Sequence, residues 1–121
     1  MNLIDPTTLR LVERSLDAAA LRHTAIAQNV ANANVPGAKR MQVSFEELLS
    51  VVRNDLLQGR AVAPTEIPQA TVSEATGSQE TIELDKEMAA MSSNSLHYQA
   101  LVRALNRHLG MLSMAMQDGK R

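Results

Sequence analysis

The chain has 121 residues, a length that suits one folded domain rather than two. Its 12 Lys and Arg nearly balance its 13 Asp and Glu, so charge gives no reason to expect nucleic acid or an anionic membrane as the main partner. The absence of Cys excludes disulfides and Cys-ligated zinc, while seven Met and frequent Ala are typical of surfaces where helices pack together.

A long helix is predicted over residues 5–34. Asp5 can cap its start, and Pro6 at the first helical position lacks only an N–H that would be unpaired anyway. Apolar residues then recur in alternating steps of three and four, which places them in one stripe along a helix. The stripe consists of Leu9, Val12, Leu16, Ala19, His23, Ile26, Val30 and Ala33.

The corner that ends this helix is rich in Asn. Pro36 disfavours helical backbone at the residue before it, and Gly37 eases the turn. Asn34 suits a helix that frays into its cap. Asn29 and Asn32, one turn apart, have two interpretations: they belong to the same fraying end, or they hydrogen-bond across helices and fix the register.

Residues 35–58 are predicted to hold this turn and a short helix over about 45–57. Ser44 and Glu47 have the spacing of a capping box, which makes Ser44 the expected N-cap.

Pro, Gly, Ser and Thr break every period in residues 59–81. A stretch this long without regular structure is either mobile or held by a partner. We predict an extended or disordered linker, which could include a brief strand at 70–72.

The last helix is predicted over residues 82–117 and organises the chain. It carries two neighbouring stripes with the heptad spacing of a coiled-coil seam. The first is Leu84, Met88, Met91, Ser95, Tyr98, Val102, Leu105, Leu109, Leu112 and Met116, and the second is His97, Leu101, Ala104, His108, Met111 and Ala115. Such a broad apolar arc is covered either by the short middle helix, in a three-helix bundle, or by other molecules.

The expected fold class is therefore all-α, with one domain over residues 1–121. Its long N- and C-terminal helices are predicted to run antiparallel and form a coiled-coil-like pair. A short middle helix and an extended or disordered central segment connect them.

The sequence offers no constellation for chemistry, so we expect no enzyme activity, cofactor or metal. His97 and His108 stand eleven residues apart, too far along a helix to share an ion. Asp85 and Glu87 are two apart and point in different directions, so they are interpreted as charges at a helix start.

Residues Gln28–Arg40 resemble the N-terminal signature of bacterial flagellar rod and hook proteins, an Asn-rich helix end followed by Pro-Gly and a basic residue. Val35 and Ala38 stand where that family usually has Thr and an aromatic residue. Three further stretches, Arg22–Ala27, Phe45–Leu48 and Asn94–Leu101, resemble one short member of the family.

The resemblance implies a structural subunit of the proximal rod, in the periplasmic part of the flagellar basal body. It implies self-assembly into an open helical structure that connects the MS ring and export gate region to the rest of the rod and transmits torque. The implied partners are further copies, the adapter protein FliE, the MS ring region and neighbouring rod proteins. It also implies export through the flagellar type III apparatus without a cleaved signal peptide, and the charges at Asp5, Arg10 and Glu13 argue against a secretory signal.

Subunits joined by non-closing contacts need surfaces that one copy cannot cover. We therefore expect a free chain that is monomeric and partly unfolded at both ends. The alternative is a soluble coiled-coil adaptor or export chaperone that binds a partner helix. The residues expected to carry assembly are Leu9, Val12, Leu16, Ile26, Asn29, Val30, Asn32, Asn34, Pro36, Gly37, Tyr98, Leu101, Val102, Leu105, Leu109 and Leu112.

Overall fold

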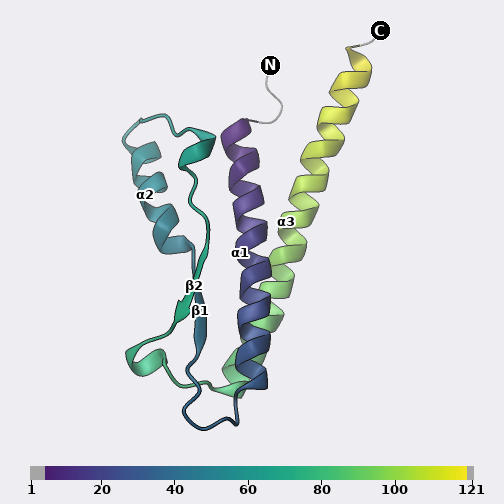
Figure 1. Cartoon of the computed structure of the whole chain (residues 1–121). Helices are drawn as coiled ribbons and strands as arrows, with labels where there is room; N and C mark the ends of the chain where they lie inside the picture. The colour runs from purple at the N-terminus through teal and green to yellow at the C-terminus, as the bar shows by residue number, and fades with distance from the viewer. Residues whose placement is uncertain (1–4, 120–121) are drawn as a thin grey trace.

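The computed structural model describes residues 5–119 and contains three helices, two strands and two 3₁₀ turns. Two long helices dominate it: α1 (Pro6–Ala31) and α3 (Leu84–Asp118) lie side by side and run in opposite directions (Figure 1). The predicted antiparallel terminal pair is confirmed.

The ends of α1 follow the local sequence. Asp5 is the N-cap, and its carboxylate accepts a hydrogen bond from the Thr8 N–H at 3.2 Å, with Pro6 at the first helical position. The helix ends at Ala31, three residues before the predicted end, and Asn32 is its C-cap. Asn is a weak helix former, so the chain leaves the helix before it reaches the Pro-Gly turn.

The structure is mostly helical, as predicted, and adds a small antiparallel sheet that the sequence did not predict. Strand β1 (Met41–Ser44) pairs with β2 (Thr71–Glu74), so that Met41 lies opposite Glu74 and Ser44 opposite Thr71. Ser44 is therefore a strand residue, and the predicted capping box is wrong. The buried Phe45 precedes α2 (Glu46–Leu57) without a side-chain cap.

Residues 59–81 fold back onto the domain, so the prediction of disorder does not describe them. They contain β2, close to the expected strand, and the turns η1 (Pro64–Glu66) and η2 (Gly77–Gln79). Val62 and Ile67 pack against Val52 of α2 in a small core, and the Thr7 hydroxyl of α1 donates to the Val62 carbonyl at 2.9 Å.

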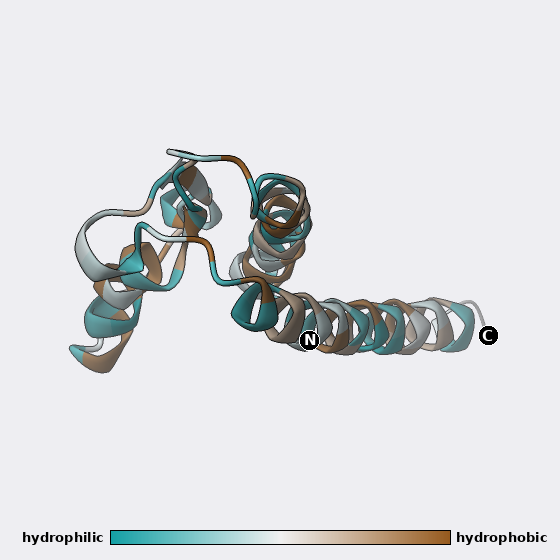
Figure 2. Ribbon diagram, turned by 90° about the horizontal axis from the view of Figure 1, so that it is seen from below, coloured by the Kyte–Doolittle hydropathy of each residue, from teal (hydrophilic) through white to brown (hydrophobic). Residues whose placement is uncertain are grey.

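Helix α2 does not cover α3. It packs beside η1, and Figures 1 and 2 both show α2 on one side of the molecule, apart from α3. In the view of Figure 1, α1 lies between the two. The three-helix bundle that the sequence left open is therefore not formed by the described residues, and no helix within residues 5–119 covers the outer side of α3.

Candidate assembly surface

Helices α1 and α3 meet closely because the meeting residues are small. Ala18, Ala19 and Ala25 are buried along α1, together with Ile26. From α3, the side-chain amide of Asn94 donates to the Ala19 carbonyl at 2.8 Å. Such a bond requires the two backbones to lie near each other, so it fixes one point of the register between the helices.

A buried polar cluster fixes a second point, near the corner that follows α1. The Glu87 carboxylate of α3 is only 2% exposed and accepts from Arg40 Nε at 2.7 Å and from Asn29 Nδ2 at 3.2 Å. The Asn29 amide also pairs with both backbone groups of Met41, at 2.9 and 2.8 Å. One Asn thus joins α1, β1 and α3, and the neighbouring Arg⁺ compensates the buried carboxylate.

The two interpretations of the Asn pair therefore divide between the residues. Asn29 makes contacts across elements, as the register hypothesis requires, whereas Asn32 acts as the helix cap. Asn34, Pro36 and Gly37 form an exposed turn, and Gly37 adopts φ 78°, which favours glycine there.

The other residues expected to carry assembly lie on the two long helices. Ile26 is buried, and Leu9, Val12, Leu16, Val30, Leu101, Val102, Leu105 and Leu112 are half-buried, while Tyr98 and Leu109 are exposed. The apolar stripes are thus partly covered by the pairing of α1 with α3 and remain partly open.

Sequence reasoning missed Glu87, Asn94 and Arg40. A signal for two of them exists, because Glu87, Asn94 and Leu101 occupy the same position in successive heptads and continue the second stripe toward the start of α3. A search restricted to apolar residues ends that stripe too early. It therefore assigns the inward direction at the start of α3 to Leu84 and Met88, both of which are exposed.

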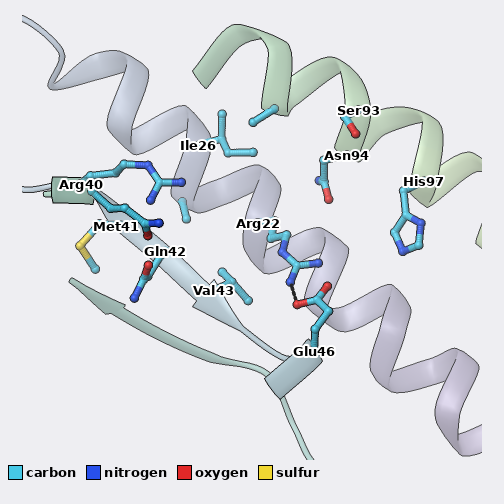
Figure 3. A pocket seen from close by; sticks show the side chains of 13 residues that line it. Arg22, Ile26, Arg40, Met41, Gln42, Val43, Glu46, Ser93, Asn94 and His97 are labelled. Atoms are coloured by element: carbon cyan, nitrogen blue, oxygen red, sulfur yellow. Dashed lines mark hydrogen bonds and ion pairs between the residues drawn. The ribbon is translucent and has the colours of Figure 1, made fainter. Parts of the chain in front are cut away.

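A groove of about 470 Å³ lies between α1, β1 and α3 (Figure 3). An ion pair between Arg22 and Glu46 crosses it and ties the start of α2 to α1 (Figure 3). Burial by itself raises the pKa of Glu46, but the hydrogen bond from Arg22 and the nearby positive charges outweigh it and leave the pKa below its ordinary value.

Residues 5–119 contain no cluster of three or more His, Asp or Glu side chains that could hold a metal ion. None of the helices described is long and apolar enough to cross a membrane. A pair of long helices with partly open apolar stripes is typical of a structural protein whose helices pack against further helices.

Comparison with known proteins identifies the class more closely. No family model matches the chain. It is 27% identical to the flagellar basal body rod protein FlgB of Bacillus subtilis, over 93% of this chain and 95% of that protein. It is 26% identical to FlgB of Escherichia coli, over 92% of this chain and 94% of that protein, and equally to FlgB of Shigella flexneri.

These similarities extend over nearly the whole chain and include both terminal helices. The chain is a FlgB-like flagellar basal-body rod protein. The three relatives are named as rod components and not as enzymes, in agreement with the expectation from the sequence.

Proposed function

We propose that this chain is a structural subunit of the proximal rod and polymerises there through its terminal helices. In this role it connects the MS ring and export gate region to the rest of the rod and transmits torque. The observation that supports the proposal is the open apolar surface of α3, whose Met116 is 60% exposed and whose outer side no described helix covers.

The proposed partners are further copies of the chain, the adapter protein FliE, the MS ring region and neighbouring rod proteins. The proposed route to the periplasm is the flagellar type III apparatus, without cleavage of a signal peptide. An extended structure built from non-closing contacts needs at least two different interaction surfaces on each subunit. The exposed apolar residues at both ends of α3 meet that requirement.

The test is complementation in a flagellated bacterium that lacks its own FlgB. The chain is expected to restore swimming and to be present in isolated basal bodies. In dilute solution, gel filtration should give a monomer, and circular dichroism should give less helix than the folded chain contains. A stable small oligomer that never enters basal bodies would instead favour the coiled-coil adaptor or chaperone.

A further inference from the structure

The two ends of α3 both expose apolar side chains at helical spacing. Leu84 and Met88 are exposed at its start, and Leu109 and Met116 at its end. Each pair spans one to two turns of helix and forms a short ridge of large side chains on an element whose middle packs on α1. We call these the start ridge and the end ridge.

The end ridge is open because α3 extends past α1. Asn94 bonds to Ala19, and thirteen residues back from Ala19 is Pro6, where α1 begins. Thirteen residues forward from Asn94 is Arg107, so the remaining residues of α3, through Asp118, extend about 16 Å beyond the first residue of α1 (Figure 1). The first apolar stripe of α3 continues through this extension with Leu109, Leu112 and Met116.

The start ridge is open for a different reason. Glu87 and Asn94 point toward α1 and β1, where their partners lie. Met88 directly follows Glu87 and therefore lies about 100° round the helix from it, away from the interior. Met88 is 50% exposed, and Leu84, one turn earlier, is 49% exposed. The polar cluster thus fixes the rotation of α3 and exposes the start ridge.

The two ends also carry opposite charge. Residues 80–88 contain four acidic residues and one Lys, of which Glu87 is buried against Arg40 and Glu83 pairs with Lys86, so Glu80 and Asp85 supply the excess negative charge. Residues 103–121 contain four basic residues and one Asp. Within the described chain, Arg103 and Arg107 form no ion pair. Like ends would therefore repel, and unlike ends attract.

We infer that the end ridge of one copy packs beside the start ridge of the next copy, with about two turns of helix in overlap. The contact is heterologous and does not close on itself, so it repeats along an open assembly. The inference rests on the proposed function and specifies which surfaces of the chain meet. Each ridge is small, so single contacts are weak and association requires high local concentration.

The chain contains no Cys, which allows cross-linking from introduced positions alone. Met88→Cys and Met116→Cys variants are purified, mixed at high concentration and treated with a short bifunctional maleimide. A cross-linked dimer is expected from the mixture and at least fivefold less from either variant alone. Leu57→Cys, at a side chain 78% exposed on α2, replaces one partner as the matched control and should give no specific dimer.

The same positions are then combined in one chain and expressed in the complementation strain. Basal bodies that contain the double variant should give a ladder of cross-linked multimers. Basal bodies that contain the chain but give no ladder above the Leu57→Cys control would overturn the inference and leave the proposed function standing. A chain absent from basal bodies would contradict the proposed function, and the purified mixture would still decide the contact.

Two further outcomes also decide it. Cross-linking of Met116→Cys with itself as strongly as with Met88→Cys would mean that like ends meet, and would refute the head-to-tail contact. Leu84→Cys mixed with Leu109→Cys provides an independent pair from the same two ridges. Failure of both pairs to exceed the control would refute the contact even if one variant folds poorly.

Discussion

Removal of the Glu87 carboxylate tests whether the buried polar cluster fixes the helix pair. In Glu87→Ala, Arg40 and Asn29 each lose an acceptor, and a buried space is left in α3. The Asn29 amide keeps its two bonds to the backbone of Met41. The substitution should therefore weaken the packing of α3 against the corner that follows α1, and leave the contact between α1 and β1 intact.

The magnitude follows from the surroundings of each group. Breaking one side of a fully buried ion pair costs about 3–5 kcal/mol. The Arg40 side chain is 30% exposed, so water can partly replace its partner. The hydrogen bond from Asn29 is longer, at 3.2 Å, and its donor is neutral, so its loss contributes less to the free energy of unfolding than the loss of the Arg40 pair. We expect a loss of about 2–4 kcal/mol in the free energy of unfolding.

Urea unfolding followed by circular dichroism measures this loss. With a slope of about 2 kcal/mol per molar urea, the midpoint should fall by about 1–2 M. Glu13→Ala is the matched control, because Glu13 pairs with Arg10 at 3.4 Å on the exposed side of α1 and should cost less than about 0.5 kcal/mol. Equal midpoints for the two variants would refute the reasoning.

Three further predictions concern local features. Gly37→Ala should lower the free energy of unfolding by about 1 kcal/mol, because φ is 78° at this position. Gly110→Ala should raise it by about 1 kcal/mol, because Gly110 lies within α3 and an added Cβ would meet no atom within 4 Å. Melting temperatures that shift in the same direction for both variants would contradict this. Asn94→Ala removes the hydrogen bond to Ala19 and should lower the free energy of unfolding by about 1–2 kcal/mol. Asn106→Ala, at an exposed position of the same helix, should lower it by no more than about 0.5 kcal/mol. Equal losses in urea unfolding would show that Asn94 does not fix the register. Because the pKa of Glu46 is lowered in the folded state, its carboxylate stabilises the fold above its ordinary pKa, and that contribution is lost as pH falls through the lowered value. The difference between Glu46→Gln and the unchanged chain should therefore shrink in acid, and a difference that grows would refute the assignment.

Much of the fold was predictable because it rests on local rules. Asp5 and Pro6 start α1, and the Pro-Gly pair at the corner prevents its continuation. The heptad spacing of apolar residues sufficed to pair the terminal helices in opposite directions. These signals lie within a few residues of the feature that they determine.

The sheet and the polar cluster could not be predicted in the same way. Strand β1 has four residues, too few for a periodic signal. Its first residue, Met41, is bonded through its backbone to the side chain of Asn29, twelve residues earlier in the chain. Glu87 is stable in the interior only because Arg40 and Asn29 reach it from distant parts of the chain. No pattern around Glu87 reveals those partners, so reasoning from apolar positions placed it outside.

The candidate site shares this division. The half of α3 near the corner meets its neighbours through polar groups that accept one arrangement only, since a shift by one residue would leave a carboxylate and an amide buried without partners. The last third of α3, beyond α1, exposes apolar side chains such as Leu109 and Met116, for which no polar partner is required. Polar contacts thus set the position and rotation of the helix within the subunit, and this determines which apolar side chains are left for other molecules. A change at Glu87 should therefore alter assembly without touching either ridge.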